Sequence, residues 1–385
     1  PGDVDLDGVP DLLVGARGAD AVYLVSGAGS QVLAEAPRLV GEVASWAGVA
    51  VDGAGDTDGD GWPDLVVGAR NDDLGGDDAG AAYLVRGPVG SGLLRDHVTL
   101  LGEGPGDNAG IAVAGPGDLD GDGLADLAVG ARNHDAGGSN AGAVYLLFGP
   151  ISSGTLGDEG VKLLGKQSGD LAGRSLAAAG DIDGDGQQDL LVGALFAHQA
   201  GTVYVVTDQD LDTELVGVEP DDSAGRSLAG VGDIDGDGLD DLIVGAPDAS
   251  PNGASSGIAY LVLGPATVGT LALAEASLLG ENTGDNAGQS VTGADVNGDG
   301  VPDLVVGAYK NEPAGSDRGA VYVVFGPTSG TVELSGAIKL MGLEDNDQAG
   351  GAVSRVGDLD GDGREDLLVG AHQADWGGDN AGAAY

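Results

Sequence analysis

The sequence predicts an all-β protein, a seven-bladed β-propeller whose blades are four-stranded antiparallel sheets. A nine-residue acidic segment recurs seven times, and its copies start 53, 62, 63, 52, 62 and 63 residues apart. Such a period indicates one supersecondary unit repeated in register. Each copy is followed by a short run that is apolar throughout, which is typical of a strand buried on both faces. A ring of blades gives every sheet two neighbours and so accounts for that burial.

The third unit shows the order of the elements. An apolar segment at 109–115 precedes the acidic segment, and further apolar runs follow at 126–131, 143–148 and 161–164. All four runs have strand length and are bounded by Gly, Pro, Asn or Asp, and none is long enough for a helical pattern. We name these strands A to D in chain order, so that the acidic segment joins A to B.

We expect a single domain, 1–385, because a fixed internal period outweighs a domain count based on length. Its repeat units begin near residues 1, 47, 109, 172, 224, 287 and 349. The first unit lacks strand A, and the seventh stops in strand C at Tyr385. The sequence therefore predicts termini cut in mid-blade, 26 of the 28 strands of a full ring, and membership of a longer chain.

The charge of the chain excludes two classes of partner. It has 63 acidic and 15 basic residues and a formal net charge of −48, and a surface so negative repels nucleic acid and anionic lipid. No apolar stretch reaches the length that spans a membrane. The chain has no cysteine, which excludes disulfides and thiolate metal sites. We expect no nucleic-acid partner and no membrane insertion.

The acidic segment has the chemistry of a calcium-binding loop. Ca²⁺ prefers six to eight oxygen ligands in flexible geometry. Carboxylates at positions one, three and five of a tight loop converge on one point, the backbone carbonyl of position seven adds a ligand, and the carboxylate of position nine closes the shell. Position six is Gly in all seven copies, as expected where a sharp turn needs a positive φ. We expect up to seven Ca²⁺, one in each blade.

The expected metal ligands are positions one, three, five, seven and nine of each copy. In the first four copies they are Asp3, Asp5, Asp7, Val9, Asp11, Asp56, Asp58, Asp60, Trp62, Asp64, Asp118, Asp120, Asp122, Leu124, Asp126, Asp181, Asp183, Asp185, Gln187 and Asp189. In the last three they are Asp233, Asp235, Asp237, Leu239, Asp241, Asp295, Asn297, Asp299, Val301, Asp303, Asp358, Asp360, Asp362, Arg364 and Asp366. The single Asn keeps an oxygen and removes one charge.

The EF-hand is excluded as an alternative. It needs a bidentate Glu at position twelve between two helices, whereas position twelve here is always Val, as at Val67 and Val129, inside the apolar run. Without a cation the carboxylates of one loop repel one another, by about 4 kcal/mol for a pair roughly 4 Å apart at an effective dielectric of about 20. The loop therefore favours a divalent cation.

Three motifs together resemble the FG-GAP repeat of integrin α-subunits and of many bacterial surface proteins. Ala-Gly opens strand A, as at Ala109-Gly110, the acidic loop follows, and Leu-x-Val-Gly-Ala opens strand B. The resemblance covers essentially the whole chain. The family's Gly-Ala-Pro is complete only at Gly245-Ala246-Pro247. The resemblance implies an integrin-like N-terminal propeller, and all seven blades carry the calcium loop here, whereas integrins usually carry it in some.

The expected function is that of an extracellular module for adhesion or for binding a protein or carbohydrate. Loops of this kind in extracellular modules bind Ca²⁺ at about 10⁻⁴–10⁻³ M, which favours a secreted or surface location. The A–B and C–D turns share one rim, so we expect the ligand on the opposite face, formed by the B–C and D–A connections. The long B–C loops are 71–80, 133–142, 248–257, 310–319 and 372–382.

Residues that interrupt the repeat are the better candidates for ligand binding. They are Trp46, His134, His198, Tyr309, Lys310, His372 and Trp376. Aspartates two residues before Ala-Gly recur in five units, so turn capping explains them. They are Asp107, Asp170, Asp222, Asp285 and Asp347. The tyrosine that recurs in strand C is expected to be a packing residue.

No catalytic set is present, and we do not expect an enzyme. The chain has no Gly-x-Ser-x-Gly elbow, no zinc-type His cluster and no phosphate loop. Two alternatives stay open. Some polysaccharide lyases resemble this architecture, and here Lys310, Arg132 and Arg70 would have to supply the basic residue. The other is a structural spacer within a larger surface protein.

Overall fold

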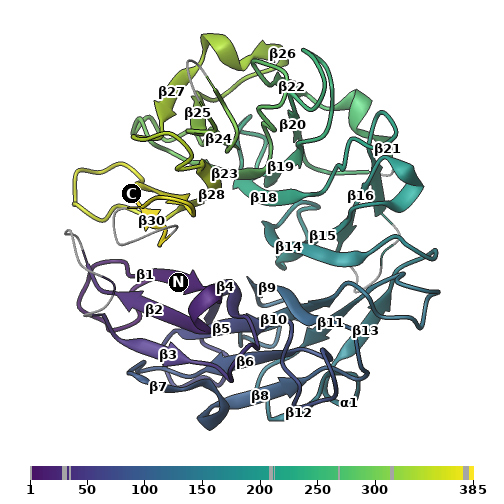
Figure 1. Ribbon diagram of the computed structural model, residues 1–385, viewed down its shortest axis with the longest axis vertical. Coiled ribbons are helices and arrows are strands. Elements are labelled where there is room, and N and C mark those ends of the chain that lie inside the picture. The colour runs from purple at the N-terminus through teal and green to yellow at the C-terminus, as the bar shows by residue number, and fades with distance from the viewer. Residues whose placement is uncertain are drawn as a thin grey trace.

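The computed structural model describes residues 2–27, 33, 36–207, 211, 213–267, 269–312, 316–375 and 381–385. Seven small sheets stand around a central axis as the blades of a propeller (Figure 1), with the two ends of the chain on neighbouring blades. The predicted all-β, seven-bladed fold is confirmed. Among the described residues, no helix has the length and apolar character that a membrane span requires.

The strands follow the predicted order in every blade. Blade one holds β1 (Leu12–Ala16), β2 (Ala21–Val25) and β3 (Arg38–Val40), and blade two holds β4 (Ala47–Gly55), β5 (Asp64–Ala69), β6 (Ala81–Val85) and β8 (Val98–Leu101). Blade three holds β9 (Ala109–Gly117), β10 (Asp126–Ala131), β11 (Ala143–Leu147) and β13 (Val161–Leu164). Blade four holds β14 (Ala172–Gly180), β15 (Asp189–Ala194), β16 (Thr202–Val206) and β17 (Thr213–Val216).

Blade five holds β18 (Ser227–Gly232), β19 (Asp241–Ala246), β20 (Ile258–Val262) and β22 (Ala276–Leu279). Blade six holds β23 (Ser290–Ala294), β24 (Asp303–Ala308), β25 (Ala320–Val324) and β27 (Ile338–Met341), and blade seven holds β28 (Ala349–Arg355), β29 (Leu367–Ala371) and β30 (Ala383–Ala384). Adjacent strands within a blade pair antiparallel. In blade three, β9, β10, β11 and β13 match the four ranges expected from the sequence to within two residues.

Four short strands were not predicted from the sequence. They are β7 (Gly92–Leu93), β12 (Gly154–Thr155), β21 (Gly269–Thr270) and β26 (Gly330–Glu333). Each lies in the C–D connection of one blade and pairs in parallel with strand D of the preceding blade, so blades two, four and five have five strands and blade one has four. The pattern within one repeat unit does not predict these strands, because each of them pairs with a strand of a different unit.

Short helical turns follow several of these strands or lie in the B–C connections. They are the α-helix α1 (Leu156–Glu159) and the 3₁₀ turns η1 (Arg17–Ala19), η3 (Leu94–Asp96), η4 (Ala197–Gln199), η5 (Leu271–Leu273) and η6 (Leu334–Gly336). A leucine from this type of turn, such as Leu94 or Leu156, is fully buried. The four turns that follow β7, β12, β21 and β26 each bury one leucine, whereas η1, in a B–C connection, buries none.

The hydrophobic core is a series of layers between blades. Strand B is buried at every position in blades two to six, as in β5 and β10. One apolar cluster joins Val66 and Leu84 of blade two to Leu127 and Tyr145 of blade three. Burial on both faces is thus confirmed there, whereas β1 and β29, on the two blades that carry the chain ends, are partly exposed.

The strand register fixes two distinct faces. In blade two, Gly55 pairs with Asp64 next to the acidic loop, and Ala47 pairs with Ala69 at the other end of the same strands. Strand A is innermost, because β4, β9, β14, β18, β23 and β28 contact one another in succession around the ring. The acidic loops therefore lie on one face near the axis, and the B–C and D–A connections lie on the opposite face.

Candidate metal loops and the opposite face

The first aspartate of each acidic loop organises the loop backbone. In the third loop, Asp118 Oδ1 accepts hydrogen bonds from the N–H groups of Gly121 (2.7 Å) and Asp122 (3.2 Å), and its Oδ2 accepts one from Gly123 (2.8 Å). Gly123 has φ +91°, a conformation that glycine adopts without strain. The glycine at position six is therefore required by the turn, as predicted.

The loop carboxylates converge as the sequence predicts. Oxygens from three aspartates of one loop lie within 4.8 Å of one another in at least five of the loops. In the second and third loops these residues occupy positions one, three and five, and in the first, fourth and fifth loops they occupy positions one, three and nine. The position-seven residue donates its N–H to the position-five carboxylate, as Leu124 does to Asp122 (2.9 Å). Coordination by its carbonyl stays a prediction.

The position-nine aspartate does more than the sequence indicated. Asp126 is fully buried, and its Oδ2 accepts from Leu119 N (2.7 Å) while its Oδ1 accepts from Gly149 N (3.0 Å) in the C–D turn. Three other position-nine residues accept from the same turn: Asp64 from Gly87, Asp241 from Gly264, and Asp303 from Gly326. This carboxylate therefore ties the A–B loop to the C–D turn of its own blade.

Burial sets the ionisation of the position-nine carboxylates. Burial raises the pKa of Asp126 to about 6, although the N–H groups of Leu119 and Gly149 lower it, and the charges of Asp120 and Asp118 add smaller increases. Burial likewise raises the pKa of Asp189 to about 7 and that of Asp241 to about 6. Without a cation these loops carry negative charge that the protein alone does not compensate.

The acidic loops are linked to one another around the ring. Ala125 of the third loop donates its N–H to the carbonyl of Asp56 in the second (3.0 Å). Equivalent bonds join Gln188 to Asp118 (3.3 Å), Asp240 to Asp181 (3.0 Å) and Glu365 to Asp295 (3.0 Å). A change in one loop can therefore reach the loop of the next blade through the backbone.

The aspartates expected to cap turns do so. Each accepts the backbone N–H of the residue three positions earlier, at 2.8 to 3.0 Å. The residues are Asp107, Asp170, Asp222, Asp285 and Asp347.

The strand C tyrosines are more than packing residues. Tyr145 donates to Glu103 (2.9 Å) and Tyr83 donates to Asp72 (2.6 Å), so their hydroxyls hold buried or half-buried carboxylates.

Two of the histidines that interrupt the repeat have structural partners. His134 is buried and its Nε2 lies 2.8 Å from Glu103 Oε2. His198 Nε2 lies 3.2 Å from Glu214 Oε2. These contacts account for the positions of both histidine side chains, so no ligand is needed to explain why the two residues are there.

Trp46, Tyr309, Lys310 and His372 lie on the face opposite the metal loops. Tyr309 packs against His372, with ring centroids 6.3 Å apart, and Lys310 lies over the Tyr309 ring at 4.9 Å. Trp46 stacks with Arg70, whose guanidinium carbon is 4.2 Å from the ring centroid. Trp376 lies outside the described residues.

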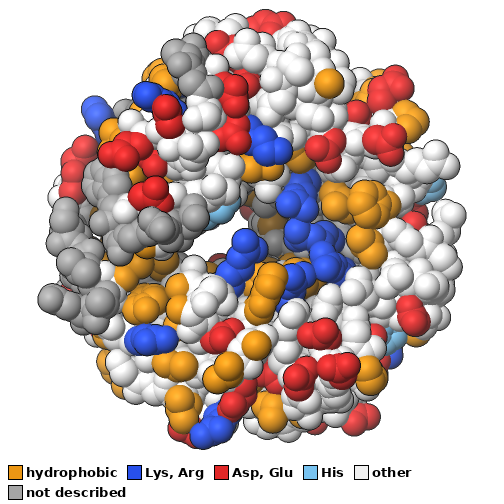
Figure 2. All heavy atoms as spheres, in the orientation of Figure 1, with side chains coloured by type: hydrophobic (Ala, Val, Ile, Leu, Met, Phe, Trp, Pro, Cys, Tyr) orange, Lys and Arg blue, Asp and Glu red, His pale blue; other side chains and the backbone are white. Residues whose placement is uncertain are grey.

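A group of arginines lies on this face, and from the sequence only Arg70 and Arg132 were named, as basic residues of the lyase alternative. We call Arg17, Arg70, Arg132, Arg174 and Arg226 the arginine ring. The first three directly follow strand B of blades one to three, the fourth is the third residue of β14, and the fifth directly precedes β18. Lys and Arg side chains line the upper, right-hand and lower rim of the central opening in Figure 2. A signal was available, since Arg follows Gly-Ala in three units and Ala-Gly in two others.

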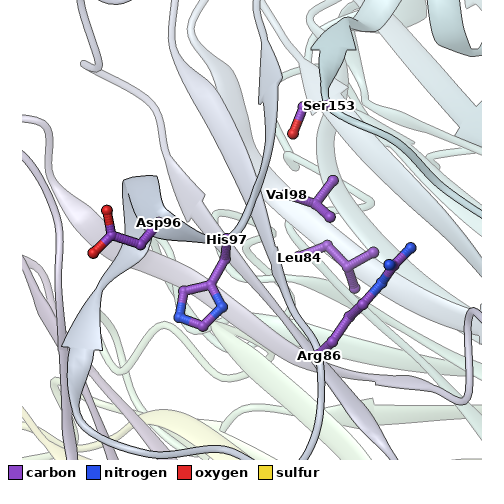
Figure 3. Close-up of a pocket in the computed structure, with 6 residues that line it drawn as sticks. All are labelled: Leu84, Arg86, Asp96, His97, Val98 and Ser153. Atoms are coloured by element: carbon purple, nitrogen blue, oxygen red, sulfur yellow. The ribbon is translucent and has the colours of Figure 1, made fainter. Parts of the chain in front are cut away.

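A cavity of about 330 Å³ lies at the outer edge of blades two and three (Figure 3). Its lining residues are Leu84, Arg86, Asp96, His97, Val98 and Ser153. Arg86 is already engaged, because it donates to the carbonyl of Ile151 (2.8 Å) and lies 3.1 Å from Asp58. Ser153 Oγ accepts from Thr99 N (3.0 Å). This hollow therefore offers few free polar groups to a ligand.

Comparison with known proteins agrees with the geometry. The family model of the FG-GAP repeat matches residues 109–147, 172–206 and 224–262, and that of the FG-GAP-like repeat matches 3–67 and 295–369. Integrin alpha pat-2 of Caenorhabditis briggsae is 33% identical over 232 residues, which are 53% of this chain and 18% of the relative. Phosphatidylinositol-glycan-specific phospholipase D of Bos taurus is 32% identical over 168 residues, which are 39% of this chain and 20% of that enzyme.

A solved structure shares the fold. It is the crystal structure of BBS1N in complex with ARL6DN, soaked with mercury, with a TM-score of 0.52, 14% identity and coverage of 99% of this chain and 88% of that chain. The chain spans a fifth or less of the two curated relatives named above. The repeats, the relatives and the seven blades agree: the chain is an integrin alpha-like propeller built from FG-GAP repeats.

Proposed function

We propose that this chain is a calcium-binding propeller of a secreted or cell-surface protein and that it binds a protein or carbohydrate ligand on the face opposite the metal loops. The observation that carries the proposal is the convergence of three loop carboxylates within 4.8 Å, repeated from blade to blade. Like charges gathered so closely are stable together when a cation is shared between them. Such loops then serve as anchors for the blades.

The residues present fit Ca²⁺ by two criteria. Two oxygens that each lie about 2.3–2.6 Å from one Ca²⁺ are at most about 5 Å apart, and the observed groups satisfy this limit. The donors are carboxylate and amide oxygens, with no His or Cys among the loop positions, and such a set suits hard cations. Mg²⁺ demands near-ideal octahedral geometry and keeps several waters, so a flexible loop rich in carboxylates favours Ca²⁺.

The protein's own residues transmit the effect of the metal to the fold. A bound cation supplies positive charge to the loop carboxylates. The hydrogen bond from Gly149 to Asp126 then fixes the C–D turn against the metal loop. The hydrogen bond from Ala125 to the carbonyl of Asp56 fixes the loop of the preceding blade in the same way. The metal face is thereby a fixed base, and the opposite rim can hold ligand-binding loops in a defined arrangement.

The extracellular setting and the adhesion role rest on chemistry and on relatives. Loops with the affinity of extracellular modules fill at about 10⁻⁴–10⁻³ M Ca²⁺, a concentration met outside cells. Integrin alpha chains of several animals share this repeat, which favours ligand binding in adhesion over the lyase reaction. The proposed function includes both a protein and a carbohydrate as classes of ligand.

Terbium luminescence tests the metal sites directly. Trp62 is the one aromatic residue at position seven of any loop, so Tb³⁺ bound in the second loop should be sensitised by tryptophan excitation. We expect emission that Ca²⁺ displaces. The matched control is Trp62→Leu, which copies Leu124 of the third loop: emission should vanish while calorimetric Ca²⁺ binding persists. No emission and no calorimetric binding would overturn the calcium proposal.

Ligand binding is tested on a mixed array of proteins and glycans, probed with and without Ca²⁺. Binding that requires Ca²⁺ supports the proposed function. If the chain binds no protein or glycan on the array under either condition, it is a structural spacer instead. Unsaturated products released from an acidic polysaccharide would identify a lyase.

A further inference from the structure

The arginine ring is a positive centre in a strongly negative molecule. Of the 15 basic residues in a chain of formal net charge −48, five gather on the face opposite the metal loops, around the axis. Trp46 connects two of them, because its ring lies 4.2 Å from the guanidinium carbon of Arg70 and 5.6 Å from that of Arg17. Arg17 is exposed and the other four arginines are half-buried, so the ring faces solvent.

The members of the ring act on one another. Burial, together with the charges of Arg226, Arg132 and Arg70, lowers the pKa of Arg174 to about 10. Burial and the charges of Arg132 and Arg17 lower the pKa of Arg70. A guanidinium with a pKa near 10 stays protonated at neutral pH. The ring therefore keeps its positive charge although its members repel one another.

No acidic side chain of the described residues forms an ion pair with the ring. Asp78 raises the pKa of Arg70 through its charge but does not reach ion-pairing distance. By contrast, Arg86, Arg95 and Lys162 each pair with a carboxylate elsewhere. The Nε atoms of Arg70 and Arg132 are buried and have no hydrogen-bond partner within the described part of the chain. Guanidinium groups that have no carboxylate partner keep N–H donors for an incoming carboxylate, which arginine can bind in bidentate fashion.

We propose that the arginine ring binds a compact, multivalent carboxylate anion presented by the acidic tip of a protein loop or chain end. This inference rests on the proposed function, and it names the chemistry of the ligand that the face opposite the metal loops accepts. The tip would enter along the axis, where carboxylates can accept hydrogen bonds from several guanidinium groups at once. The positive centre would also steer such a tip, because the surrounding surface is negative.

The charge distribution favours a compact tip over an extended polyanion. The exposed residues Asp77, Asp135 and Asp248 lie in the B–C loops outside the ring. An acidic polysaccharide lying across this face would meet those carboxylates on either side of the ring and be repelled by them. A narrow tip that carries its charge at one point avoids that contact.

Peptide binding measured by tryptophan fluorescence tests the proposal. The probe is a short, end-blocked peptide of consecutive glutamates, added to the whole chain in Ca²⁺. We expect a saturable change in emission, lost in Trp46→Phe and weakened by added salt. The same peptide with glutamines should not bind. A chain of acidic polysaccharide that binds more tightly than the peptide would overturn the proposal, as would failure of the glutamate peptide to bind.

The double variant Arg70→Gln with Arg132→Gln should weaken peptide binding about tenfold or more. The matched control is Arg95→Gln with Arg318→Gln, which removes the same charge from surface ion pairs with Glu42 and Asp345 and should leave binding unchanged. The ring variant should melt at the same or a higher temperature, because repulsion is relieved. A lower melting temperature together with unchanged peptide binding would show that the arginines serve the fold alone.

The same samples separate this inference from the proposed function. The ring variant should keep the Trp62-sensitised Tb³⁺ signal, because the ring and the metal loops lie at opposite ends of the blade strands. If peptide binding fails while metal binding and a ligand from the array persist, the proposed function stands and the ring assignment falls. If metal binding fails while the peptide still binds through Arg70 and Arg132, the ring stands and the calcium proposal falls.

Discussion

Gly68 of β5 and Gly110 of β9 meet backbone to backbone across the boundary between blades two and three. A Cβ on Gly68 would collide with the carbonyl oxygen of Gly110. The same contact recurs at five further boundaries: Gly15 with Gly48, Gly130 with Gly173, Gly193 with Gly225, Gly245 with Gly288, and Gly307 with Gly350. The two glycines that identify the repeat in the sequence are therefore the contact that lets neighbouring blades pack closely.

Gly68→Ala should destabilise the protein by about 1–3 kcal/mol, because the added methyl group overpacks the boundary between blades. Gly370→Ala is the matched control. It occupies the same motif position in blade seven, where an added Cβ would lie 3.4 Å from Ala352 Cβ, an ordinary contact. Denaturant unfolding in Ca²⁺ measures both. Equal destabilisation by the two substitutions would contradict the role given to the contact.

Asp126→Ala should destabilise the protein even in excess EGTA, since it leaves the N–H groups of Leu119 and Gly149 without their acceptor. Each unsatisfied buried donor costs about 1–3 kcal/mol. Asp120→Ala, at the exposed position three of the same loop, should change little in EGTA and should only reduce the stabilisation by Ca²⁺. Melting curves of both variants in the two conditions decide the point. If Asp126→Ala does not change the melting temperature in EGTA, the role of Asp126 is confined to metal binding.

Metal binding in adjacent loops should be coupled, because Ala125 of the third loop donates to Asp56 of the second. Asp122→Ala removes a third-loop ligand and should weaken Tb³⁺ binding in the second loop by about fivefold, the lower range of coupling between sites. Asp299→Ala makes the same change in the sixth loop, which is distant in the ring. The Trp62-sensitised titration should then be unaffected. Equal effects from both variants would argue against coupling through the adjacent backbone.

Glu281→Gln should lose stability in a manner that depends on pH. Hydrogen bonding from Lys339 Nζ (2.6 Å), followed by that from Tyr322 (2.8 Å), lowers the pKa of Glu281 below its ordinary value of 4.5. A carboxyl whose pKa is lower in the folded state contributes stability above its unfolded pKa, and this contribution disappears as pH falls through the folded pKa. The difference in melting temperature between wild type and Glu281→Gln should be full at pH 7 and shrink below about pH 4.5. A difference that stays constant down to pH 3 would rule out the charge as its source.

The repeat made most of the fold predictable. Strands A to D and the loops between them depend on interactions within one unit, so the apolar runs and the turn glycines were enough to place β9, β10, β11 and β13. The parallel strands β7, β12, β21 and β26 were missed because they pair with the preceding blade. The extra bonds of Asp126 were missed for a similar reason, since Gly149 lies 23 residues away in another turn.

Local sequence determined the seven blades and the seven acidic loops, because the hydrogen bonds that shape each loop join residues at most a few positions apart. The packing of the blades around the axis decided which residues of different repeat units meet. It set Gly68 against Gly110 and brought Arg17, Arg132 and Arg226 to one opening from three different blades. These three arginines are far apart in the chain, and Arg226 holds a different position in its repeat from Arg17 and Arg132. Only the circular packing of the innermost strands therefore places their charges together.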